Sequence, residues 1–286
     1  MEQKYELIKG TYSLYRVKAL KDFTLITGET IKKGDFGGFV KSEDCLGQEG
    51  NCWIMDDAYV EGEVSGNAVV KDFAIVNGHV SENAVVKDHA AVYGDVFGDP
   101  IIKDYAKIYG SVSGNAIIKD FAKVYGDVCG NAIVKDDGFV GTNTIVTGNT
   151  VVQAFQRINY GTVTTDLLGT KDWAGALYAE FGVFPKDGKV TLYKNVRSTD
   201  NPNVFGSVYN RKFIYEIGKE AIETDVDEDI IKWRGKGLHF TSLKFIDPWE
   251  GNTILECEVD LKDIITIQYS VVRTRKCKVI RVYKEE

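Results

Sequence analysis

The 286-residue chain lacks the sequence features that would place it in several common functional classes. It contains no run of eighteen apolar residues, so no membrane-spanning helix is expected. Its first ten residues, MEQKYELIKG, have no apolar stretch of the kind that a secretion signal requires. There is no GxGxxG motif, no phosphate-binding loop, no Ser-His-Asp order and no His/Asp set with metal-ligand spacing. We therefore expect neither a bound metal nor a cofactor.

Cysteine is scarce, and its spacing shows no paired motif. The five cysteines are an odd number and form no CxxC pair. Such a set predicts reduced thiols, as in a cytoplasmic protein, and not a disulfide framework or a zinc site.

The charge is unevenly distributed. Residues 1–186 contain 18 Lys/Arg and 25 Asp/Glu, whereas residues 187–286 contain 17 of each. An acidic first part argues against sequence-independent binding of nucleic acid. The difference between the two parts also suggests two domains.

What the chain does contain is a repeat of sixteen residues. Equivalent positions carry the same large aliphatic residues, in three columns: Val64, Val80, Val96, Val112 and Val128; Val70, Val86, Ile102, Ile118 and Val134; Val76, Val92, Ile108, Val124 and Val140. Small residues stand between them, in two columns: Ala68, Ala84, Pro100, Ala116 and Ala132; Ala74, Ala90, Ala106, Ala122 and Gly138. A fixed period of this kind predicts a solenoid, whose repeats bury their apolar faces against one another.

The spacing within one repeat indicates the shape of a coil. The large aliphatics are 6, 6 and 4 residues apart, and the first two are each followed four residues later by a small residue. This is the pattern of hexapeptide β-helices, here with one side of a triangular coil shortened. A meander of β-hairpins is the competing interpretation. Parallel stacking explains the period better, because each residue then lies over its own copy at about 4.8 Å.

Outward positions of the repeat also form columns. Asn67 and Gly78 each begin a column of a residue type that tolerates left-handed corners. Lysines stand beside aspartates from Lys71 and Asp72 onward. Two aromatic ladders are expected: Phe73, His89, Tyr105 and Phe121; Tyr93, Tyr109 and Tyr125. We interpret all these columns as structural.

The domain organisation follows from where this pattern begins and fades. Residues 1–56 form an N-terminal cap, because the end of a stack exposes an edge that must be covered. Residues 57–152 form the parallel β-helix, and residues 153–186 form a connector with a short helix at Trp173–Phe181. Residues 187–286 form a small α+β module.

Units such as Gly66–Val70 and Gly114–Ile118, with the pattern Gly-Asn-Ala-x-Val/Ile, resemble a phage and prophage family of hexapeptide β-helix proteins. The resemblance covers residues 10–150 and implies a left-handed parallel β-helix. Members of this family are often labelled transferases, but that label rests on fold analogy and implies little about chemistry.

The C-terminal module resembles a small module of phage rIIB-like lysis-control proteins. The resemblance rests on Gly237-Leu238-His239, the Asp263-Ile264 step and the basic strand that follows. The family pattern has a proline before that step, and this chain has Leu261 near its place. The resemblance implies a phage-encoded protein that acts in the host cytoplasm.

The candidate site is built around His239. It lies two residues after Gly237, in a turn, and its neighbours Thr241 and Ser242 offer hydroxyl groups; a pocket would add Tyr193, Lys194 and Trp249. This set is loosely similar to ADP-ribosyltransferase-like folds, which implies a nucleotide-type ligand held by Lys194 or Arg197 together with Glu256 or Glu258. Alternatively, His239 is a buried histidine whose hydrogen bonds order the turn.

Two further groups of residues offer weaker candidates. Arg273 and Arg275 lie on a basic strand that could bind phosphate, or that could be a solvated edge strand whose charges deter aggregation. A hexapeptide acyltransferase would need His79 or His89 as a general base. Both histidines, however, occupy ordinary column positions of the repeat.

These observations predict a non-catalytic scaffold and binding protein, whose module engages a host or phage protein or a small ligand. A role in counter-defence or lysis control follows from the resemblance alone. Homo-oligomers are compatible with the regular columns, and no membrane partner is expected. The alternative is an enzyme that acts on a nucleotide-type ligand in the C-terminal module, or, with less support, an acyltransferase.

Overall fold

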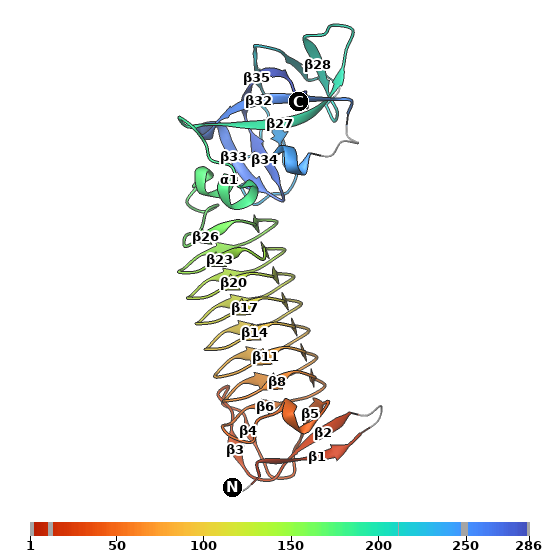
Figure 1. Ribbon diagram of the computed structural model, residues 1–286, viewed down its shortest axis with the longest axis vertical. Coiled ribbons are helices and arrows are strands. Elements are labelled where there is room, and N and C mark those ends of the chain that lie inside the picture. Colours follow the sequence, from red (N-terminus) through yellow and green to blue (C-terminus); the bar gives the residue numbers. More distant parts are fainter. Residues whose placement is uncertain (1–2, 11–13, 211, 247–250, 285–286) are drawn as a thin grey trace. The chain divides into compact units, whose positions relative to one another are not determined.

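The computed structural model describes residues 3–10, 14–210, 212–246 and 251–284, which fold mainly as β-structure (Figure 1). The chain forms two compact units. The first comprises Met1–Ala154 and Gly161–Asp166, and the second comprises Phe155–Tyr160 and Leu167–Glu286. Among the described residues, no helix is both long enough and apolar enough to cross a membrane.

The first unit is a parallel β-helix whose coils contribute one short strand to each of three sheets. The first sheet contains β7 (Tyr59–Val60), β10 (Ile75–Val76), β13 (Ala91–Val92), β16 (Lys107–Ile108), β19 (Lys123–Val124) and β22 (Phe139–Val140). The second contains β8 (Glu63–Val64), β11 (His79–Val80), β14 (Asp95–Val96), β17 (Ser111–Val112), β20 (Asp127–Val128), β23 (Thr144–Val146) and β26 (Gly161–Val163). The third contains β6 (Trp53–Ile54), β9 (Val69–Val70), β12 (Val85–Val86), β15 (Ile101–Ile102), β18 (Ile117–Ile118), β21 (Ile133–Val134) and β24 (Val151–Val152).

The stacking of like upon like is confirmed. Val64 pairs with Val80 and Val80 with Val96, all in parallel strands. The second residue of each two-residue strand points inward, and these valines and isoleucines are 0–1% exposed. The alanines of the small columns are also fully buried. The predicted fold class is therefore correct, and the solenoid core is a column of aliphatic side chains.

The corners of the coil use a different residue from the one expected. The left-handed conformation falls on two other columns: the aspartates from Asp56 to Asp136, with φ of 54–60°, and the column of Gly66, Glu82, Gly98, Gly114 and Gly130, with φ of 59–90°. The side chain of Asp72 accepts a hydrogen bond from the Asp88 backbone N–H (3.1 Å), and the same bond recurs up the stack. The column that starts at Gly78 does not have positive φ. It needs glycine because a Cβ at Gly94 would lie 2.0 Å from the carbonyl oxygen of Gly110.

The outward columns are ordered by their neighbours. Amide groups pass hydrogen bonds along the asparagine column, for example from Asn67 to Asn83 (3.0 Å) and from Asn115 to Asn131 (3.1 Å). The rings of Phe73, His89, Tyr105 and Phe121 stack with centroids 4.9–5.3 Å apart. The tyrosine ladder is stacked in the same way. Both predicted ladders are thus confirmed.

The cap continues the first sheet. Strand β2 (Tyr15–Ala19) pairs antiparallel with β1 (Tyr5–Lys9) on one side and with β5 (Phe36–Val40) on the other. Strand β5 in turn pairs in parallel with β7. Strands β3 (Phe23–Thr24) and β4 (Thr30–Ile31) form a separate hairpin, and a 3-10 helix spans Glu43–Cys45. The buried Lys4 ammonium donates to the Cys52 carbonyl (3.1 Å), which closes the N-terminal end of the stack.

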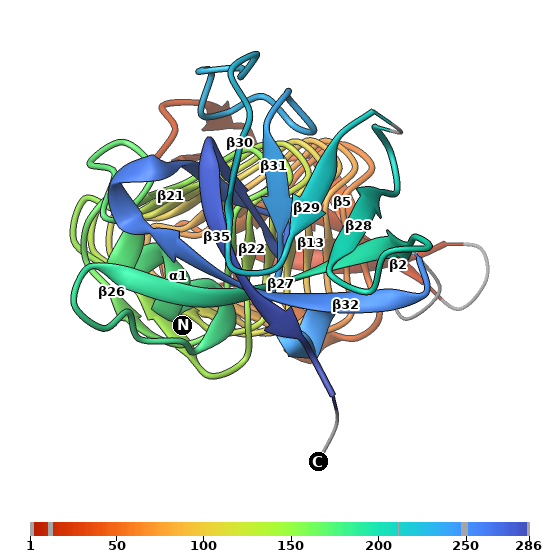
Figure 2. The same ribbon diagram turned by 90° about the horizontal axis from the view of Figure 1, so that it is seen from above.

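The described residues of the second unit form two antiparallel sheets and one α-helix. The larger sheet has the order β29 (Ile214–Glu216), β28 (Val204–Ser207), β27 (Lys189–Ser198), β32 (Thr253–Asp260), β35 (Lys276–Val282), β30 (Glu220–Ile222). Figure 2 shows β27, β32 and β35 crossing the view as neighbours in this twisted sheet. The smaller sheet has the order β31 (Leu238–Phe240), β34 (Val271–Thr274), β33 (Ile264–Gln268). Two 3-10 helices span Leu243–Phe245 and Leu261–Asp263.

The helix α1 (Trp173–Phe181) has the predicted bounds. The Asp172 side chain caps its start by accepting from the Gly175 N–H (2.9 Å), and Gly182 ends it with φ of 71°. It packs against β33 and β25 (Arg157–Ile158), so residues that the sequence suggests as a connector belong to the second unit.

Candidate functional site

Four of the predicted site residues come together where β27 meets β31, namely Tyr193, Lys194, His239 and Thr241. The backbones of Tyr193 and Thr241 exchange two hydrogen bonds, with N···O distances of 2.8 and 3.0 Å. His239 lies two residues before Thr241 and stands opposite Arg273 of β34. Lys194 follows Tyr193 and therefore points to the opposite face of β27. Trp249 lies outside the described residues.

The Lys194 ammonium is held by groups of the protein itself. It donates a hydrogen bond to the His239 carbonyl (2.8 Å). Its nitrogen also lies 5.5 Å from the ring centroid of Tyr215 and 5.3 Å from that of Phe240. Such cation–π contacts stabilise a desolvated ammonium group. Lys194 therefore acts as a link between β27 and β31.

The environment of His239 keeps its imidazole neutral. Burial, together with the smaller effect of the nearby cations Lys194 and Arg273, lowers the pKa of this side chain to about 4. A general base works best with a pKa near the operating pH. At pH 7 the imidazole of His239 is thus a neutral hydrogen-bonding group and a weak base.

Arg273 stabilises a loop. Its side chain is 2% exposed, and the guanidinium donates to the carbonyls of Lys232 (3.0 Å) and Asp229. Gly235 leaves room for this, since a Cβ there would lie 1.9 Å from Nη1 of Arg273. The neighbouring strand assists, because the Thr266 hydroxyl donates to the Ile230 carbonyl (2.7 Å).

Arg275 has a separate environment. It forms an ion pair with Glu228, and both side chains are partly or largely exposed. The two arginines of the basic strand therefore do not converge on one anion site. Arg273 donates hydrogen bonds to carbonyl groups of the loop, and Arg275 pairs with Glu228 on the surface.

The hydroxyl groups of the site differ in how they are satisfied. Thr241 donates to the Ser270 carbonyl (2.7 Å). The Ser242 hydroxyl is buried and has no hydrogen-bond partner within the described part of the chain. Buried polar groups are almost always paired, so an unpaired one is a place where a further group can bind.

The sequence did not single out Glu180, the most strongly buried carboxyl group of this unit. It lies on α1 and is 2% exposed. Its Oε1 accepts from the Ser270 hydroxyl (2.8 Å) and from the Asn159 amide (3.2 Å). Burial outweighs these bonds and the charge of Arg157, and raises the pKa of Glu180 to about 8. A signal existed: in WAGALYAEF, this is the single charged residue of an otherwise apolar helix, which indicates burial.

Glu180 holds a strained turn. Tyr269 and Ser270 join β33 to β34 and have φ of 51° and 62°. Non-glycine residues in this region cost roughly 1–3 kcal/mol each. The turn is fixed by Glu180, by the Tyr269 N–H bond to the Phe155 carbonyl (2.9 Å), and by ring contacts of Tyr269 with Trp233 and Phe155. The turn and its partners form a rigid end of the smaller sheet.

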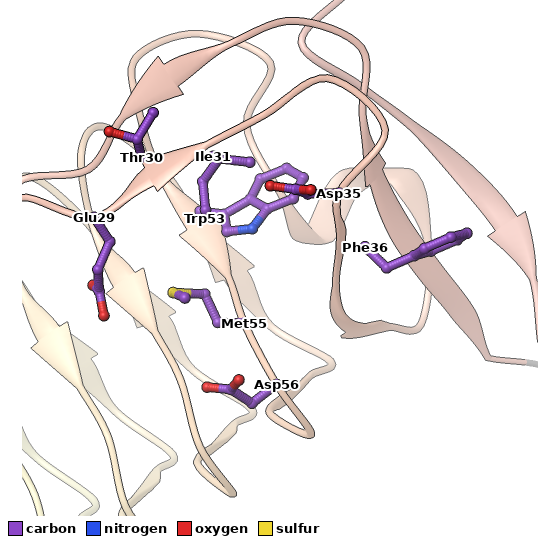
Figure 3. Close-up of a pocket in the computed structure, with 8 residues that line it drawn as sticks. All are labelled: Glu29, Thr30, Ile31, Asp35, Phe36, Trp53, Met55 and Asp56. Atoms are coloured by element: carbon purple, nitrogen blue, oxygen red, sulfur yellow. The ribbon is translucent and has the colours of Figure 1, made fainter.

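The first unit has an open hollow of about 450 Å³ in its cap. Figure 3 shows its lining, which consists of Glu29, Thr30, Ile31, Asp35, Phe36, Trp53, Met55 and Asp56. Its carboxylates are engaged locally: Glu29 pairs with Lys71, Asp35 accepts from the Lys32 N–H (2.8 Å), and Asp56 accepts from the Asp72 N–H (3.3 Å). The hollow therefore has no carboxylate that lacks a protein partner.

Neither metal-binding geometry nor a known relative assigns a chemistry to these groups. Within the described residues, no cluster of three or more His, Cys, Asp or Glu side chains could hold a metal ion. All five cysteines are free thiols. No protein-family model matches the chain, and no curated protein matches it.

Proposed function

We propose that this chain is a non-catalytic scaffold and binding protein of the phage or prophage type. The β-helix is the rigid scaffold, and the C-terminal module engages a host protein or a small ligand in the host cytoplasm. A counter-defence or lysis-control role belongs to the same proposal and depends on the resemblance of the repeat units and of the Gly237-Leu238-His239 segment.

The observation that carries the proposal is the in-register stacking of exposed side chains along the β-helix. Phe73, Tyr105 and Phe121 are each more than half exposed, yet their rings are stacked and ordered. Solenoids use such extended, regular faces to bind other macromolecules. Exposed aromatic groups that are already ordered lose little entropy on binding.

The second unit supports binding over catalysis. Lys194 and Arg273, the cations nearest His239, are bound to carbonyl groups of their own chain. The neutral His239 is a weak base. The paired polar groups of the predicted site thus stabilise the fold, which is the ordinary role of buried hydrogen-bonded groups.

The alternative is an enzyme that acts on a nucleotide-type ligand in this module, and the unpaired Ser242 hydroxyl favours it. Its other required groups are engaged. Arg197 donates to the Ser207 carbonyl (2.7 Å), Glu256 pairs with Arg281 (2.9 Å), and Glu258 pairs with Lys189 (2.7 Å). An acyltransferase has less support, because His89 is stacked between Phe73 and Tyr105, and His79 pairs with Asp95 (2.8 Å).

Thermal unfolding of the full chain with NAD⁺ or ATP tests this choice. We expect that neither nucleotide changes the Tm of the parent protein. We expect the His239→Ala variant to have a lower Tm of its own, which neither nucleotide changes. A ligand at about 100 times its Kd would add about 2.7 kcal/mol of stability. A rise in Tm that His239→Ala abolishes and that the exposed-histidine control His79→Ala retains would establish the enzyme alternative instead.

A further inference from the structure

The third sheet of the β-helix presents an outward column of large apolar residues. The first residue of each strand points outward, and neighbours pair in register from Trp53 to Val151. The members of this column are Trp53, Val69, Val85, Ile101, Ile117, Ile133 and Val151. Two polar columns flank it. Two residues before each middle member stands an asparagine or aspartate, and two residues after stands a lysine, as in Asn115-Ile117-Lys119.

The first two members of this column are covered by the chain itself. Trp53 is 1% exposed and Val69 is 0% exposed. The covering segment is residues 23–31, which includes the hairpin β3–β4. Figure 3 shows Ile31 of this segment beside Trp53, and Glu29 lines the same hollow.

The covering segment contacts all three columns of the face. The Phe23 ring packs edge-on against Trp53, with centroids 5.2 Å apart. The Asn51 amide, in the asparagine column, donates to the Thr24 carbonyl (3.0 Å). The Lys71 ammonium, in the lysine column, pairs with the Glu29 carboxylate (3.0 Å). A segment that presents an aromatic residue and a carboxylate, here as the hairpin β3–β4, is therefore complementary to this face.

Farther along the stack, the same face is exposed. Ile101 is 37% exposed, and Val85, Ile117, Ile133 and Val151 are partly exposed. The lysine column continues beside them, and Lys103 and Lys119 lie 3.5 and 3.6 Å from their neighbouring aspartates. Ion pairs that are partly exposed contribute little to stability. Lys71 also has Asp72 beside it and still forms its closer contact with Glu29, so these aspartates do not prevent a second carboxylate from binding.

We propose that the exposed part of this face, from Val85 to Val151, binds an acidic segment of a partner protein. The segment presents an apolar side chain to the aliphatic column and a carboxylate to the lysine column, as residues 23–31 do for the first two coils. Four coil steps of about 4.8 Å give a docking length of about 19 Å. This surface lies wholly in the first unit, so it is independent of what the second unit binds.

The probe is a fluorescein-labelled peptide with the sequence of residues 22–31, which contains Asp22 and Glu29 and no lysine or arginine. It is added to the full-length protein and followed by fluorescence anisotropy. We expect saturable binding that becomes at least about tenfold weaker in Ile117→Lys, since a buried charge without a partner costs more than 1.4 kcal/mol. The matched control is Ile75→Lys, which changes an outward isoleucine of the first sheet and leaves binding unchanged. Circular dichroism verifies that both variants are folded.

A charge exchange makes the test specific. The Lys119→Glu variant should bind the parent peptide more weakly. A peptide that carries Glu29→Lys should recover binding to this variant. The proposal is wrong if no saturable binding occurs up to about 1 mM peptide, the weakest affinity of interest, or if Ile75→Lys and Ile117→Lys weaken it equally. It is also wrong if sedimentation shows a parent dimer that Ile117→Lys dissociates, because the occupant would then be a second copy of the chain. Nucleotide binding to the second unit would leave all these results unaffected.

Discussion

At the scale of single residues, the Glu180 carboxyl group shows burial and hydrogen bonding acting in opposite directions. Two side chains donate to its Oε1, and bonds of this kind favour the charged form. Burial favours the neutral form and has the larger effect, so the pKa rises from 4.5 to about 8. Near neutral pH, the group that holds the Tyr269–Ser270 turn is therefore largely protonated.

This raised pKa predicts a pH-dependent stability. Between pH 4.5 and 8 the folded chain binds more protons at Glu180 than the unfolded chain, so the free energy of unfolding falls as pH rises, by at most about 1.4 kcal/mol per pH unit. The contribution is fully present below pH 4.5 and is lost as pH rises through 8. We expect Glu180→Gln to reduce the stability difference between pH 5 and pH 8 by about 2–4 kcal/mol, measured by urea unfolding.

Glu63→Gln is the matched control for this prediction, because Glu63 is an exposed glutamate of the β-helix. It should leave the pH profile of the parent unchanged. A profile for Glu180→Gln that parallels the parent would contradict the buried, protonated carboxyl. His239 acts with the opposite sign: its lowered pKa makes stability fall as pH drops from 6.5 towards 4, so the two groups oppose each other between pH 4.5 and 6.5. The comparison of Glu180→Gln with the parent isolates Glu180, because His239 is present in both.

At the scale of elements, one coil is the unit that the sequence repeats, and it can be removed. Deleting residues 97–112 joins Val96 to Ser113, the residue that follows its register partner Val112 in the parent. Every inward position then receives its own equivalent, so we expect a folded, shorter β-helix. Since solenoid stability is approximately a sum over repeats, the loss should be modest. Circular dichroism and thermal unfolding measure both properties.

A deletion of half a coil is the control. Removing residues 97–104 places Tyr105 after Val96 and moves the inward aliphatic residues that follow away from the core. A one-residue slip already exchanges the two faces of a strand, and this shift also misplaces the corners. We expect this variant to aggregate or to lose its β signal. If both deletions behave alike, the sixteen-residue coil is not the stacking unit.

The β-helix was predictable because its information is local and repeated. The inward valines, the alanines, the asparagine and aromatic columns and the bounds of α1 could all be read from neighbouring residues. The cap hairpin on Trp53 and the loop held by Arg273 could not, because they depend on pairs such as Lys71–Glu29 and Arg273–Asp229 that are far apart in the chain. His239 and Thr241 are near neighbours in the chain and were predicted together, whereas the hydrogen-bond partners of Glu180, Ser270 and Asn159, are distant from it in the sequence.

At the scale of the whole molecule, the chain passes between its two units more than once. Residues 155–160 belong to the second unit, residues 161–166 return to the first, and the second resumes at Leu167. The charge difference between residues 1–186 and 187–286 therefore does not coincide with this division. The helix α1 lies before residue 187, yet its buried side chains Trp173, Leu177 and Phe181 belong to the core of the second unit.

Two fragments follow from this division. A fragment of residues 1–186 retains α1 without β31, β33 and β34, so the apolar side chains of the helix become exposed. A fragment of residues 1–166 lacks α1 and should retain the β-helix signal in circular dichroism. We expect the longer fragment to bind several-fold more of the dye ANS and to self-associate in sedimentation, because large uncovered apolar patches promote association. Equal dye binding by the two fragments would show that α1 does not depend on the smaller sheet for its cover.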